Sequence, residues 1–224
     1  MIRKRTVLII ITTVVLIFLI SGLINGFPPD VRLLALTPKI LQYRELIQKY
    51  AAKEDLDARF ICALITQESG FNEKAESPVG ALGLTQLMPN TAKELGVEDP
   101  FDAEQNVAGA TRYLNTLYHA FPDSPDEDRH RLVLASYNGG LGRVRDAQAL
   151  IRHGKMANPT LWGPVSIALS QLTRTHADIH REVWEIGEPP HGYFEGSDKT
   201  LYFVDRVMHY YDRIQLYGGF LFFL

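Results

Sequence analysis

DARFICALITQESGFNEKAESPVGALGLTQLMP, residues 57–89, joins a short apolar helix to a glycine-containing loop, and this pairing indicates the architecture of the chain. Phe60 and Leu64 recur at helical spacing, so we predict a helix over residues 57–69. Glu68 continues the same spacing by one more turn. The pattern therefore puts a carboxyl group at the end of an apolar helix face.

The position of Glu68 has a chemical consequence. Burial at the end of an apolar face disfavours the charged form of a carboxyl group and raises its pKa. A carboxylic acid that stays protonated near neutral pH is what cleavage of a glycosidic bond requires, because the leaving oxygen must receive a proton. The alternative is an exposed glutamate on a fraying last turn, which the helix pattern alone does not exclude.

Two further segments carry residue types suited to a ligand site. Residues 77–89 form a predicted loop with two glycines and flanking prolines, and glycines let a backbone approach a ligand closely. Residues 135–140, ASYNGG, end a predicted helix on an aromatic ring, an amide and two glycines. Tyr137 and Asn138 could stack on a sugar and bind its hydroxyl or acetamido groups. The competing interpretation is that Asn138 and the glycines only cap the helix.

Helical patterns fill the rest of the body, and no alternating strand or internal repeat is evident, so the predicted fold class is mainly α. Pro38 suits the first turn of a helix, and Asp102 with Gln105 matches a capping box. The acidic residues 123–128 are predicted to form a solvated loop. The remaining expected helices cover residues 37–50, 91–95, 102–121, 129–137, 141–152, 164–185 and 198–216.

The N-terminus is predicted to be a membrane anchor. Residues 6–24 are apolar and uncharged, close to the length of about 20 residues that a membrane-spanning helix needs. The preceding Arg3, Lys4 and Arg5 indicate a cytoplasmic N-terminus, with the rest of the chain outside the cytoplasm. A cleaved signal peptide, cut after Ser21, is the alternative.

This gives three expected regions and a location at the inner (cytoplasmic) membrane, single-pass, with the body on the periplasmic side. Residues 1–25 form a cytoplasmic tip and transmembrane anchor. Residues 26–36, which contain paired prolines, form a linker. Residues 37–224 form one helical domain.

Composition excludes several classes of function. The net charge is −3, and the body without the N-terminal basic residues is more acidic still, which argues against nucleic acid as a partner. Cys62 lies in an apolar run and is interpreted as a core residue. His176 and His180 share a predicted helix face, but they lack the glutamate of a zinc-binding H-E-x-x-H motif and a third ligand, so no metal is expected. The glycines at 139–142 follow a helix rather than a strand, so no nucleotide cofactor is expected.

Taken together and in order, these segments resemble the SLT-type lytic transglycosylase domain, whose fold is that of goose-type lysozyme. The resemblance covers about residues 50–145, and a weaker sequence match occurs at residues 201–204 near the late helix. The matching stretches are Glu68-Ser69 with Phe71-Asn72, then Ser77-Pro78-x-Gly80-Ala81-x-Gly83-Leu84-x-Gln86-Leu87-Met88-Pro89-x-Thr91-Ala92, then Tyr137-Asn138-Gly139.

The resemblance implies a role for each matched residue. Glu68 would be the general acid and then the general base. Ser69 and Gln86 would orient the substrate, and Tyr137 and Asn138 would line the sugar site. One further residue, Tyr202 in the late helix, would donate a hydrogen bond to Glu68.

The sequence departs from the family pattern at several positions. Thr85 stands where the family usually has methionine, and Ser136 where it has alanine. The family's Glu-Thr-Arg before the late tyrosine is not reproduced. Aligning on Val204 would place Phe203 at the tyrosine position. Residues 153–197 have no counterpart in the pattern.

The implied reaction is cleavage of the β-1,4 bond between N-acetylmuramic acid and N-acetylglucosamine in peptidoglycan, leaving 1,6-anhydro ends. A one-carboxylate site of this kind takes its nucleophile from the substrate and needs no cofactor. If Glu73 or Glu76 instead holds a water, the enzyme would be a hydrolytic lysozyme. A non-catalytic peptidoglycan-binding scaffold is a third hypothesis, against which an intact Glu68 speaks. The sequence leaves open endo- versus exo-cleavage and any cell-envelope assembly partners.

Overall fold

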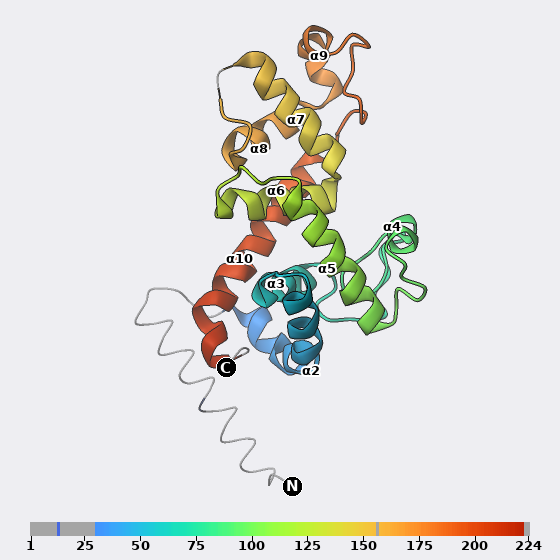
Figure 1. Cartoon of the computed structure of the whole chain (residues 1–224), viewed down its shortest axis with the longest axis vertical. Helices are drawn as coiled ribbons and strands as arrows, with labels where there is room; N and C mark the ends of the chain where they lie inside the picture. The colour runs from blue at the N-terminus through green and yellow to red at the C-terminus, as the bar shows by residue number, and fades with distance from the viewer. Residues whose placement is uncertain (1–12, 14–29, 156, 222–224) are drawn as a thin grey trace.

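The computed structural model describes residues 13, 30–155 and 157–221, which are mainly helical (Figure 1). Within these residues there is no β-strand, and only isolated bridges join Leu82 to Glu76 and Leu87. The predicted mainly α class is confirmed. The elements are α2 (Val31–Lys53), α3 (Ala58–Glu68), α4 (Pro89–Glu94), α5 (Ala103–His119), α6 (Asp126–Gly139), α7 (Leu141–Gly154), α8 (Trp162–Gln171), the 3-10 helix η1 (Arg174–His176), α9 (Ala177–Val183) and α10 (Ser197–Leu221).

Helix α2 begins earlier than predicted. The Asp30 carboxylate accepts hydrogen bonds from the backbone nitrogens of Arg32 (2.9 Å) and Leu33 (3.1 Å), and so caps the first turn. Residues 31–36, which were expected to belong to the linker, are therefore helical. Pro38 lies inside the helix rather than in its first turn.

Two other boundaries differ from the sequence prediction. Helix α6 starts at Asp126, inside the acidic run that was expected to be a loop, because acidic side chains are favourable next to a helix N-terminus. The single helix expected over residues 164–185 is broken into α8, η1 and α9. At the break, the Leu172 carbonyl accepts a hydrogen bond from the Phe194 backbone nitrogen (2.6 Å), a partner that is remote in sequence.

The start of α5 is as predicted in part. Asp102 caps the helix by accepting from the backbone nitrogen of Gln105 (2.8 Å). The Gln105 side chain does not complete the capping box; it accepts from the backbone nitrogens of Glu98 and Asp99 instead. Gln105 therefore ties the preceding loop to the first turn of α5.

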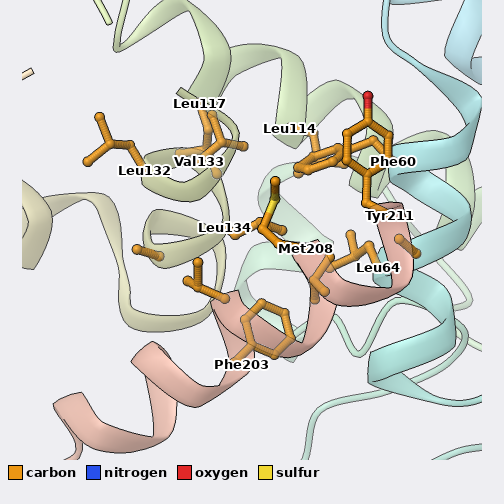
Figure 2. Close-up of a cluster of buried hydrophobic side chains, with 14 of the residues drawn as sticks. Phe60, Leu64, Leu114, Leu117, Leu132, Val133, Leu134, Phe203, Met208 and Tyr211 are labelled. Atoms are coloured by element: carbon orange, nitrogen blue, oxygen red, sulfur yellow. The ribbon is translucent and has the colours of Figure 1, made fainter. Parts of the chain in front are cut away.

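The core forms where α10 crosses α3 and α6 (Figure 1). Figure 2 shows Phe60 and Leu64 of α3 together with Leu134 of α6 and Met208 and Tyr211 of α10. Cys62 is fully buried in the same cluster, as predicted. Because α3 is held along its length by these contacts, its last residue, Glu68, has a fixed position.

The expected membrane anchor at residues 6–24 lies, apart from Thr13, outside the described residues. Among the residues that the structure does describe, no helix is both long enough and apolar enough to cross a membrane.

Candidate active site

Glu68 is the last residue of α3, and its side chain is only partly exposed. Burial raises its pKa from the ordinary value of 4.5 to about 8. Across the described residues, no hydrogen bond or ion pair is made to its carboxyl group, so nothing offsets the cost of burying the charge. Glu68 is therefore protonated at neutral pH and has a proton to donate.

Ser69 and Gln86, expected to orient a substrate, both donate to backbone oxygens of the loop that follows α3. The Ser69 hydroxyl donates to the Leu84 carbonyl (2.7 Å). The Gln86 amide donates to the carbonyls of Ala75 (3.2 Å) and Gly83 (3.0 Å). These bonds shape the loop over the end of α3, which is a structural role that the sequence did not reveal.

Asn106 of α5 is the residue that holds this loop from behind, and the sequence analysis did not identify it. It is fully buried. Its Oδ1 accepts from the backbone nitrogen (3.0 Å) and the hydroxyl (2.7 Å) of Thr85, and its Nδ2 donates to the carbonyls of Leu82 (3.2 Å) and Pro100 (2.9 Å). The available signal was an amide at the helical spacing of the apolar residues Ala110 and Leu114.

Tyr137 of α6 connects the loop to the second wall of the site. Its hydroxyl donates to the Thr85 carbonyl (2.9 Å), and its ring packs against Tyr113 of α5 at a centroid distance of 5.5 Å. Burial, followed by the negative charge of Glu68, raises the pKa of the Tyr137 hydroxyl. Tyr137 and Glu68 therefore lie close enough for the charge of one to act on the other. Tyr113 is a further neighbour that the sequence analysis missed.

Asn138 follows Tyr137 at the end of α6 and is exposed. Its Oδ1 accepts a hydrogen bond from the Thr200 hydroxyl (2.6 Å), which joins the end of α6 to α10. Its Nδ2 donates no hydrogen bond within the described residues, so the amide remains available to a ligand.

Tyr202 does not donate a hydrogen bond to Glu68, so this expectation is wrong. Tyr202 is 64% exposed on α10 and has no hydrogen-bond partner in the described part of the chain. The inward face of α10 carries Phe203 and Val204 instead. A tyrosine one position earlier falls on the outer face, since neighbouring helical residues point about 100° apart.

The two loop glutamates that could have held a water lie in different environments. Glu73 accepts a hydrogen bond from the Tyr43 hydroxyl of α2 (3.0 Å), and Glu76 is exposed. Neither forms a hydrogen bond with Glu68 in the described part of the chain.

His176 and His180 do not share a helix face, contrary to the sequence prediction. His176 ends η1, whereas His180 lies on α9 and is fully buried, with Nε2 2.9 Å from the Gln171 carbonyl oxygen. Within the described residues no group of three histidine, cysteine, aspartate or glutamate side chains is arranged to hold a metal ion.

The raised pKa of Glu68 predicts a pH dependence of stability. Below pH 4.5 the group is protonated in both states and contributes nothing. As pH rises from about 4.5 to about 8, the unfolded chain ionises first, so the wild type loses stability. We expect the Glu68→Gln variant to gain unfolding free energy relative to wild type through this range, levelling off above it. Urea titrations at several pH values measure this, and a constant difference would contradict it.

Comparisons with known proteins identify the family of this chain. The model of the transglycosylase SLT domain matches residues 45–158. The chain is 37% identical over 181 residues to a membrane-bound lytic murein transglycosylase F of Shewanella woodyi, covering 80% of this chain and 35% of that protein. A relative of the same name from Desulfosudis oleivorans is 39% identical over 179 residues, covering 79% and 37%. The chain thus spans about a third of the length of these curated relatives.

Solved structures show the same fold. The lytic transglycosylase Slt of Pseudomonas aeruginosa, solved as an inactive mutant, superposes with a TM-score of 0.53 at 22% identity, over 79% of this chain and 24% of that one. The 70 kDa soluble lytic transglycosylase of Escherichia coli gives a TM-score of 0.50 at 24% identity, over 81% and 25%.

Proposed function

This chain belongs to the transglycosylase SLT domain family, and from that membership and the chemistry of Glu68 we propose that it is a lytic murein transglycosylase. It cleaves the β-1,4 bond between N-acetylmuramic acid and N-acetylglucosamine in peptidoglycan and leaves 1,6-anhydro ends. The proposal is supported by the carboxyl group at the end of α3, whose pKa burial raises to about 8, at the position that the motif resemblance assigns to the catalytic acid.

The proposed reaction uses one carboxyl group twice. Glu68 first donates its proton to the bridging oxygen, so the bond between that oxygen and the muramic acid C1 breaks while the acetamido oxygen of the same sugar binds C1. The Glu68 carboxylate then removes the proton of the 6-hydroxyl, whose oxygen displaces the acetamido group from C1. The ring closes, Glu68 is protonated again, and no water is consumed. A pKa near the working pH suits both steps.

The surrounding residues would hold the sugar against Glu68. Tyr137 offers a ring and Asn138 an unused amide donor, and Ser69 and Gln86 fix the loop that limits where the sugar lies. We keep Tyr202 as a candidate contact for the glycan strand, because its exposed hydroxyl is free to bind one. Attack by the 6-hydroxyl on C1 of the same sugar is favoured over attack by water, because the hydroxyl is already held close to C1.

The alternative reaction is hydrolysis, in which a second carboxylate activates a water. Two variants distinguish it from ring closure. Glu73 is engaged by Tyr43 and Glu76 is exposed, so neither is poised to activate a water next to Glu68. We expect Glu73→Gln and Glu76→Gln to give products with the same mass as wild type, about 18 Da below hydrolysed ends, since ring closure replaces attack by water. Mass spectrometry of digested peptidoglycan measures this. Hydrolysed ends, with activity lost in either variant, would establish a lysozyme.

We also propose that residues 6–24 anchor the chain in the inner membrane, with the catalytic domain on the periplasmic side. The uncharged run and its basic flank support this, and the relatives are named as membrane-bound. The mature protein should keep its N-terminal residues and fractionate with membranes. Recovery in the soluble periplasmic extract, with an N-terminus near Gly22, would refute it.

A further inference from the structure

Asp146 of α7 is a buried carboxylate that serves one residue. It is 4% exposed, and it accepts two hydrogen bonds from His191: Oδ2 from the backbone nitrogen (3.0 Å) and Oδ1 from Nδ1 (3.0 Å). Burying a carboxylate is costly unless hydrogen bonds compensate. The arrangement therefore fixes both the backbone and the ring of His191, in the segment between α9 and α10.

The same hydrogen bonds determine what the other ring nitrogen can do. A carboxylate oxygen only accepts, so Nδ1 carries a hydrogen and Nε2 of the neutral ring is an acceptor. The side chain of His191 is 54% exposed, and its Nε2 bonds to nothing within the described residues. A histidine held in this way offers one oriented acceptor to solvent.

The segment around His191 packs closely on the corner between α6 and α7. A Cβ at Gly142 would overlap the His191 ring, and a Cβ at Gly139 would come within 2.9 Å of Phe194. The Arg143 guanidinium lies 4.7 Å from the centre of the Phe194 ring and donates to the Gly139 carbonyl (2.9 Å). Gly139 and Gly142 thus leave room for this segment to pack on the corner, and Arg143 contacts it there.

This corner adjoins the residues proposed to line the sugar site. It directly follows Tyr137 and Asn138. Thr200 donates to Asn138, and a Cβ at Gly139 would come within 3.2 Å of Thr200. In Figure 1 the segment between α9 and α10 runs beside α7 toward the start of α10. The segment lies beyond residues 45–158, the part matched by the family model, so His191 is outside the family pattern.

We propose that His191 is a glycan contact at the α6–α7 corner, where Nε2 accepts a hydrogen bond from a hydroxyl or acetamido N–H of an N-acetylhexosamine unit other than the one that Glu68 attacks. The inference rests on the proposed function. The Nε2 acceptor lies on a ring that is hydrogen-bonded to the Asp146 carboxylate. A neutral sugar, which offers hydroxyl and N–H donors, therefore fits it better than an anionic ligand would. Asp146 is the positioning residue of this pair.

The His191 contact should affect binding of the glycan strand rather than the bond-cleavage step. A single hydrogen bond is worth up to about tenfold in affinity. Because the bond joins a sugar that is not reacting, its loss should raise KM and leave kcat near the wild-type value.

Two matched substitutions isolate the acceptor. His191→Leu fills the same space without an acceptor, whereas His191→Gln retains an amide oxygen. Both keep the backbone nitrogen that binds Asp146. His153→Ala, at an exposed position near the other end of α7, is the control. Binding is measured by calorimetry with solubilised peptidoglycan glycan strands, in a Glu68→Gln background that does not turn them over. Steady-state rates are measured in the otherwise wild-type protein.

We expect His191→Leu to weaken strand binding about tenfold, His191→Gln to stay within about threefold of the parent, and His153→Ala to match it. Equal Kd values for the leucine, glutamine and parent forms would overturn the proposal. So would equal losses in both variants accompanied by a lower Tm, since these would show a structural role alone. If the wild type cleaves strands while all forms bind alike, only this inference fails. If the wild type neither binds nor cleaves them, the proposed function fails as well.

Discussion

Glu68→Gln should lower kcat on peptidoglycan by about 10³-fold or more. The glutamine keeps the shape of the side chain but has no proton of suitable acidity to give to the leaving oxygen. In the proposed reaction the same group then serves as the base, so both steps lose their catalyst. The fold should be undisturbed, because a partly buried ionisable group is replaced by a neutral one and no hydrogen bond is broken.

The control makes the same chemical change at an exposed acid on the neighbouring loop. Glu76→Gln should keep wild-type kcat, since this side chain lies at the surface. Both variants are assayed by release of soluble fragments from purified peptidoglycan, with circular dichroism to verify folding. A folded Glu68→Gln protein that retains more than about a hundredth of the wild-type rate, the smallest loss typical of removing an acid–base catalyst, would exclude Glu68 as the catalyst.

Gly83→Ala should produce the largest loss of stability among substitutions in the site, about 3 kcal/mol or more of unfolding free energy. Gly83 has φ +77°, where an alanine is strained. A Cβ there would also overlap the carbonyl oxygen of Pro100 and the amide of Asn106. The substitution would therefore displace Asn106, which holds Thr85 and, through it, Tyr137.

Gly80→Ala separates the two causes. Gly80 has a similar φ of +83°, but nothing lies within 4 Å of the Cβ position. It should cost only the backbone strain, about 1–2 kcal/mol. Urea unfolding of the two variants measures the difference. Equal losses would mean that the close approach of Asn106 to the loop contributes nothing.

The features that could be predicted from the sequence are those set by local rules. The capping residues Asp57 and Asp102 begin α3 and α5 where expected, since a cap depends only on the next few residues. Glu68 could be identified because helical spacing alone places it at the end of an apolar face. Tyr137 was singled out through its motif, and the charge of Glu68 acts on its hydroxyl in the structure.

The features that escaped prediction depend on partners remote in sequence. The hydrogen bonds of Asn106 to Thr85 join α5 to a loop that precedes it, and no local pattern encodes them. The break after α8 depends on the Phe194 backbone nitrogen. Tyr202 was placed by a weak motif match, whereas the apolar stripe of α10 determines which neighbour faces inward.

The proposal that Glu68 works alone, with the substrate as its own nucleophile, is tested most directly by following oxygen. Peptidoglycan is digested with the wild-type protein in water labelled with a heavy oxygen isotope, and the new glycan ends are analysed by mass spectrometry. We predict ends that carry no label and weigh about 18 Da less than hydrolysed ends, because the 6-hydroxyl closes the ring. Ends that carry one heavy oxygen would show that water attacked the sugar, and would contradict the account.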